Sequence, residues 1–173
     1  MSAGVTDTGV PVPDSVRSRN RILILATAAT IFSVLHHADH VIRGNHSGWP
    51  FQAEVTPFTF SLLIYALILP GIYLTARGCS IAGYHLFVAV SGLVLISFVH
   101  FVPVGDYEAP IDDIYAAYGS PSVGLFALVI LAGLIVSVTL LATFALKGLR
   151  ARAGHGEGGN MRGRSFPVRR KER

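Results

Sequence analysis

The chain has 173 residues, of which 51% are hydrophobic and only 14% are charged. Soluble domains carry about 25% charged residues, so this chain has too little polar surface to cover a lone soluble globule. Its single cysteine, Cys79, cannot close an intramolecular disulfide. The composition therefore excludes a lone soluble domain and points to a membrane protein.

Four stretches without Lys or Arg are long enough to cross a bilayer. A helix needs about 20 apolar residues to do so, and the candidate spans are 22–42, 57–76, 80–104 and 121–146. No strand-like alternation of the kind found in membrane barrels competes with them. We therefore expect an all-α fold, with residues 22–147 forming a bundle of four transmembrane helices that run up-down-up-down.

The positions of Lys and Arg predict the orientation of this bundle. Three cations precede residue 22, Arg77 lies between the second and third spans, and nine lie at or after Lys147, whereas only Arg43 lies on the other side. By the positive-inside rule, both termini are expected to be cytoplasmic (N-in/C-in), with the loops 43–56 and 105–120 outside. We expect a multi-pass protein of the cytoplasmic membrane.

The two ends of the chain are expected to be tails. Residues 1–21 form a cytoplasmic N-terminal tail, and residues 148–173, rich in Gly and Arg, form a disordered basic cytoplasmic tail. This tail should lie near anionic lipid headgroups. Contact of the basic tail with these headgroups accounts for the net charge of +4. No folded nucleic-acid-binding module is recognisable in the sequence. Four helices bury little surface, which leaves a homo-oligomer or a larger membrane complex open.

Aromatic residues of the two outer loops, Trp49, Tyr115 and Tyr118, fit a belt at the membrane interface. This is the expected position of such side chains in any membrane protein. No ligand is needed to explain them.

The polar residues at the outer end of the first span are the candidate functional site. His36, Asp39, His40 and Arg43 are spaced i, i+3, i+4 and i+7, so they share one stripe of a helix, while His37 points elsewhere. Polar side chains at membrane depth are costly, turn inward and mark functional sites. This stripe should therefore face the inside of the bundle.

His100 supplies a partner from the third span, because it lies at about the same depth as His36. His36, His40 and His100 then form a candidate transition-metal site, with Asp39 as a fourth ligand or as an acceptor behind the histidines. Zn, Cu, Fe and Mn remain open as the metal. We expect metal binding for sensing, delivery or redox chemistry. His85 lies about 22 Å along the helix from His100 and cannot join this cluster.

Two alternatives to a metal site remain. The stripe can be a structural or proton-relay network, with Asp39 paired to Arg43, in a non-enzymatic membrane subunit or a small transporter. A single b-type haem can also lie between His100 and either His36 or His40.

The sequence does not decide whether the protein is an enzyme. A zinc protease would need a Glu where this chain has His37, so that mechanism is excluded.

Overall fold

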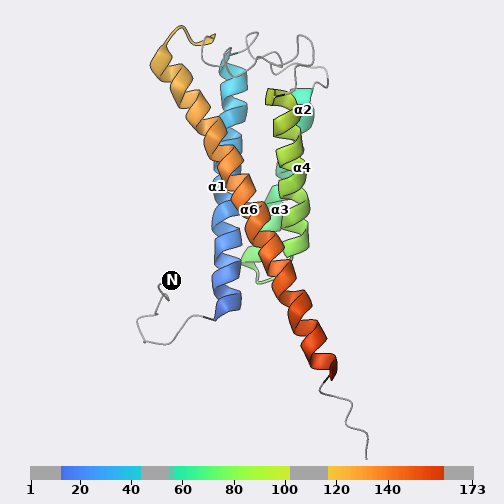
Figure 1. Ribbon diagram of the computed structural model, residues 1–173. Helices are drawn as coiled ribbons and strands as arrows, with labels where there is room; N and C mark the ends of the chain where they lie inside the picture. The colour runs from blue at the N-terminus through green and yellow to red at the C-terminus, as the bar shows by residue number, and fades with distance from the viewer. Residues whose placement is uncertain (1–12, 44–54, 56, 102–116, 162–173) are drawn as a thin grey trace, which may run out of the picture.

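The computed structural model describes residues 13–43, 55, 57–101 and 117–161 (Figure 1). Within these segments the helices are α1 (Asp14–Arg43), α2 (Pro57–Ser61), α3 (Ile64–Ala76), α4 (Ala82–Phe101) and α6 (Pro121–Met161), and there is no strand. Four of the helical stretches are long and apolar enough to cross a membrane, with α2 and α3 together forming the second. The prediction of an all-α bundle of four long apolar helices is confirmed.

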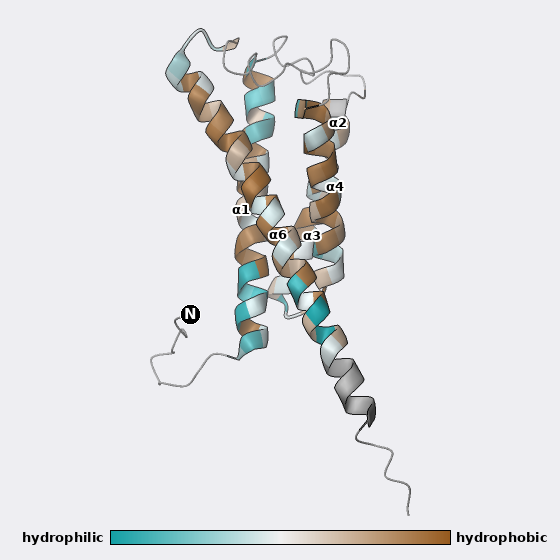
Figure 2. Cartoon of the chain, in the orientation of Figure 1, coloured by the Kyte–Doolittle hydropathy of each residue, from teal (hydrophilic) through white to brown (hydrophobic). Residues whose placement is uncertain are grey.

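Hydrophobic residues make up much of α4 and α6, whose ribbons are largely brown in Figure 2, and many large apolar side chains are exposed on the outside of the bundle. Ile24 and Ile42 of α1, Phe87 and Val94 of α4, and Phe126 of α6 are each more than 60% exposed. Such a continuous apolar exterior is rare on a soluble monomer but is what lipid tails require. We therefore describe the chain as a multi-pass membrane protein.

Helix α6 packs against both α1 and α4, and it crosses them obliquely (Figure 1). Ala26 and Ala29 of α1 and Ala89 of α4 are almost fully buried, and they belong to the same core cluster as Leu134, Val138 and Leu141 of α6. At Gly133 of α6, an added Cβ would lie 2.6 Å from the ring of Phe32. Helices in lipid associate through close packing rather than through the hydrophobic effect, so these small residues allow the association.

One end of the bundle brings together the start of α1, the turn between α3 and α4, and the later part of α6. Arg19 Nη1 lies 3.5 Å from the position of a Cβ at Gly78. The Cβ position of Gly148 lies 3.7 Å from Ala82 Cβ and 4.0 Å from Ser18 Oγ. These contacts group several basic segments at this end.

Two helices extend beyond the predicted spans. α1 begins at Asp14, whose carboxylate in the first turn favours a helix N-terminus. α6 continues to Met161, so residues 148–161, predicted to be disordered, are helical. A long helix propagates into polar sequence because adding one residue to an existing helix is far easier than starting a new one. Residues 1–12 and 162–173 lie outside the described residues, as do most of the two predicted outer loops, including Trp49 and Tyr115.

The contact between α3 and α4 depends on Gly71. A Cβ at this position would lie 2.9 Å from Tyr84 Cε1 and 3.1 Å from His85 Cε1. Neither ring is free to move away: Tyr84 Oη donates to the Leu67 carbonyl at 2.5 Å, and His85 Nε2 lies 2.7 Å from Thr75 Oγ1. Only glycine fits here without displacing these bonds.

Replacing Gly71 by alanine should therefore destabilise the bundle. Overpacking costs about 1–3 kcal/mol and should outweigh the better helix propensity of alanine. The measurement is the midpoint of thermal unfolding in detergent, followed by circular dichroism. Gly83→Ala in α4 is the matched control, because its Cβ would meet only Leu149 Cδ2 at 3.9 Å. Equal midpoints for the two variants would contradict the close contact.

Candidate metal centre

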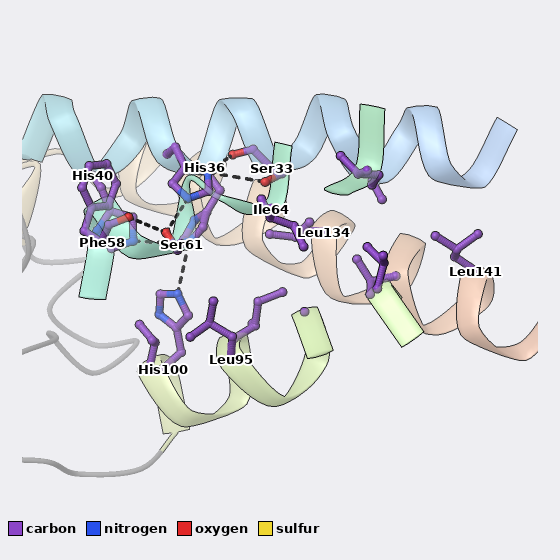
Figure 3. A pocket seen from close by; sticks show the side chains of 18 residues that line it. Ser33, His36, His40, Phe58, Ser61, Ile64, Leu95, His100, Leu134 and Leu141 are labelled. Atoms are coloured by element: carbon purple, nitrogen blue, oxygen red, sulfur yellow. Dashed lines mark hydrogen bonds between the residues drawn. The ribbon is translucent and has the colours of Figure 1, made fainter. Parts of the chain in front are cut away.

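Three buried histidines from two helices meet at one end of the bundle (Figure 3). His36 and His40 are one turn apart on α1, and His100 is near the end of α4; their exposed fractions are 6%, 3% and 6%. His36 Nε2 lies 3.0 Å from His100 Nε2 and 3.3 Å from His40 Nε2. The prediction that His100 lies at the depth of His36 is confirmed. We call these residues the three-histidine group.

Hydrogen bonding alone does not account well for this arrangement. A neutral imidazole nitrogen either donates one hydrogen or accepts with one lone pair, so His36 Nε2 cannot form a full bond to both neighbours at once. Nitrogens held about 2.0–2.1 Å from a tetrahedral Zn²⁺ lie about 3.3 Å from one another. The two separations from His36 Nε2, 3.0 and 3.3 Å, are close to this value, and the three ligand atoms all lie within 4.8 Å of one another. The donor set could therefore hold a metal ion.

Asp39 is bound to other partners. Its Oδ2 accepts a hydrogen bond from Arg43 Nε at 3.0 Å, and its Oδ1 accepts one from the Tyr118 hydroxyl. The ligand atoms that converge belong to His36, His40 and His100. The predicted pairing of Asp39 with Arg43 is confirmed. Both carboxylate oxygens of Asp39 accept hydrogen bonds from Arg43 and Tyr118, and Asp39 is not among the residues whose ligand atoms converge.

Tyr118 was expected only as part of an interfacial belt, and its contact with Asp39 was not predicted. The two residues are 79 positions apart, and no spacing in the sequence signals such a pair. Burial raises the pKa of Tyr118 from 10.0 to about 12, and the hydrogen bond and the charge of Asp39 act in the same direction. The phenol therefore stays protonated and donates to Asp39 below about pH 10, and this contribution is lost as the pH rises towards 12.

His37 lies off the three-histidine group, as predicted, and forms a separate network. Its Nδ1 is 2.8 Å from both the Ser33 carbonyl and Tyr65 Oη, and its Nε2 is 2.8 Å from Ser61 Oγ. Ser61 Oγ donates to the Phe58 carbonyl at 2.6 Å. These bonds tie α2 and α3 to α1 beside the candidate site. Sequence reasoning missed this network because its members lie on three separate helices.

A cavity of about 90 Å³ extends from the three-histidine group into the bundle. His36, His37, His40 and His100 border its polar end, with Ser33 and Ser61 (Figure 3). Most of the remaining wall is aliphatic, formed by side chains such as Ile64, Ile68, Val88, Leu134 and Leu141. The candidate site thus adjoins a mainly apolar space that is partly open to the outside of the bundle.

His85 lies apart from the three-histidine group. His85 is only 1% exposed and is bonded to Thr75, so the prediction that it does not join the cluster is confirmed.

In a bis-histidine haem, the plane of the macrocycle lies between the two ligands. His36 Nε2 and His100 Nε2 are only 3.0 Å apart, and the adjoining cavity measures about 90 Å³. This separation leaves no room for a haem between His36 and His100.

Comparison with protein-family models, curated proteins and solved structures finds no match to this chain. The assignment of the site therefore rests on its own geometry.

Proposed function

We propose that the protein is a four-helix protein of the cytoplasmic membrane that binds one transition-metal ion through His36, His40 and His100 in the outer half of the bundle. The observation that carries this proposal is the convergence of three buried imidazoles, two from α1 and one from α4, with ligand atoms all within 4.8 Å of one another. The bound metal serves sensing, delivery to a partner, or redox chemistry at the outer face. We assign metal binding to the site and no catalytic step.

The chemistry of the ligands narrows the choice of metal. Imidazole suits Zn, Cu and Fe, whereas Mn prefers carboxylate and water. The carboxylate of Asp39 is occupied by Arg43 and Tyr118, which argues against Mn. Three protein ligands leave one coordination position open, as in catalytic zinc sites and unlike closed structural ones. That open position suits a centre that exchanges a ligand or passes its metal on.

The orientation is part of the proposal, with both termini cytoplasmic and the helices running up-down-up-down. It is supported by the cations gathered at the end of the bundle away from the histidines. Arg19 lies close to Gly78, and Arg152 Nη1 donates to the Ser80 carbonyl at 3.3 Å. By the positive-inside rule, that end faces the cytoplasm, where Arg150 and Arg152 can contact anionic lipid headgroups.

Metal analysis of the detergent-purified full chain, prepared without a His tag, tests the proposal. We expect about one metal ion per chain in the wild type and almost none in the His36→Ala/His100→Ala variant, since two of three ligands are removed. His85→Ala is the matched control, because it also removes a buried imidazole but leaves the three-histidine group intact. A wild type that holds no metal and takes up no added Zn²⁺, Cu⁺ or Fe²⁺ would overturn the proposal.

A structural or proton-relay network is the second candidate function. It is favoured by the chain of hydrogen bonds through Ser33, His37, Ser61 and Tyr65, which needs no metal. In that case the wild type is metal-free, and His100→Ala lowers only the stability of the bundle. The same metal analysis separates the two functions.

A further inference from the structure

The apolar cavity beside the three-histidine group is long and narrow. Its lining residues on α1 run from Ala29 to His40, which corresponds to about 16 Å along a helix. On α6 the lining continues from Leu134 to Leu141. A volume of about 90 Å³ spread over this length leaves a passage with room for only a slim molecule.

The size and the walls of the cavity limit what it can hold. Pockets for drug-sized ligands measure about 300–1,000 Å³, and an engineered cavity of about 150 Å³ is known to take up benzene. The cavity here is smaller than either. A buried water needs about 2–4 polar partners, yet beyond the histidines and serines the wall consists of side chains such as Ile68, Val88 and Leu134. The occupant that suits it is small and apolar.

The cavity also leads to the proposed metal. All three of His36, His40 and His100 line it, so the space where a fourth ligand would approach a metal held by them is continuous with this passage. We propose, building on the metal site inferred above, that the cavity admits an apolar molecule of the size of a diatomic gas and presents it to the open coordination position. The ligand class is that of O₂, NO and CO, which dissolve in the bilayer and bind transition metals.

Gly92 of α4 allows the cavity to be blocked without touching the histidines. It lines the cavity, and an added Cβ would meet only Val138 Cγ1, at an ordinary contact distance of 3.9 Å. Gly92→Leu therefore places a side chain in the passage without a backbone clash. Gly83→Leu in the same helix is the matched control, because Gly83 does not line the cavity and its Cβ would meet only Leu149 Cδ2 at 3.9 Å.

The first measurement uses xenon, a probe of apolar cavities that needs no metal. In the full chain in detergent, we expect a saturable change in the ¹²⁹Xe chemical shift for the wild type and for Gly83→Leu, and loss of that change for Gly92→Leu. Equal xenon binding by the two leucine variants would overturn the assignment of the cavity as the binding space, whatever the metal analysis shows.

The second measurement uses carbon monoxide on Cu(I)-loaded protein, with the metal content of each sample determined in parallel. We expect an infrared band of bound CO in the wild type, and in Gly92→Leu a CO association rate lower by about tenfold or more at unchanged metal content. If metal is bound and the rate is the same in Gly92→Leu as in Gly83→Leu, the gas passage is overturned while the metal site stands. If no metal is taken up, the metal site fails and the passage to it fails with it.

Discussion

Replacing Asp39 by alanine should lower the free energy of unfolding by about 3–5 kcal/mol, which is the loss measured when one partner of a buried ion pair is removed. Asp39 and Arg43 are each only 5% exposed, and Arg43 Nε donates to Asp39 Oδ2 at 3.0 Å. The substitution removes this acceptor and also the one used by the Tyr118 hydroxyl. The measurement is the midpoint of thermal unfolding in detergent, with helical content checked beforehand.

Two further variants show which bond carries the effect. Tyr118→Phe removes one hydrogen bond to a charged group and should cost about 1.5–3 kcal/mol. Asp39→Asn keeps the shape of the side chain and removes the charge, so its stability should fall between those of the wild type and Asp39→Ala. An unfolding midpoint of Asp39→Ala equal to that of the wild type would contradict a stabilising role for the pair.

The same variants also test whether Asp39 binds the metal directly. A group that supports a metal ligand without touching the ion typically affects affinity by about 10–100-fold. We expect Asp39→Asn to keep its metal at full stoichiometry, with an affinity reduced by no more than this. Complete loss of metal from Asp39→Asn would restore Asp39 as a ligand.

Adding the metal should stabilise the folded bundle, because the ion links α1 to α4 through His100. A ligand that binds only the folded state at 100 times its dissociation constant contributes about 2.7 kcal/mol. We therefore expect the unfolding midpoint of the metal-free wild type to rise on titration with metal, and to go on rising with the logarithm of the free metal concentration once this exceeds the dissociation constant. The measurement is the thermal midpoint at increasing metal concentration.

His100→Ala should abolish this rise, since His36 and His40 remain on one helix and can no longer join two. His85→Ala should retain it, because His85 lies apart from the three-histidine group and is bonded to Thr75. An equal rise in the wild type and in His100→Ala would show that the metal binds elsewhere on the chain.

The polar stripe of α1 shows how much of the site can be predicted from sequence. The spacing of His36, His40 and Arg43 places them on one helix face, and counting residues along the helix places His100 at the same depth. Both predictions depend only on helix geometry, and the structure bears them out. Helix geometry does not say which atoms meet between separate segments, so the contact of Asp39 with Tyr118 and the partners of His37 on α2 and α3 stayed undetermined until the helices were placed.

The sequence by itself determined that the chain forms four long apolar helices, because the length of an apolar stretch and the need to satisfy every backbone hydrogen bond in lipid leave little choice. It also determined which residues are candidate ligands. Only the tertiary structure decided that Asp39 also accepts a hydrogen bond from Tyr118, that His37 joins Ser61 and Tyr65, and that an apolar cavity adjoins the three histidines. These contacts join separate segments of the chain, and their geometry depends on how closely residues such as Gly71 and Gly133 let the helices approach.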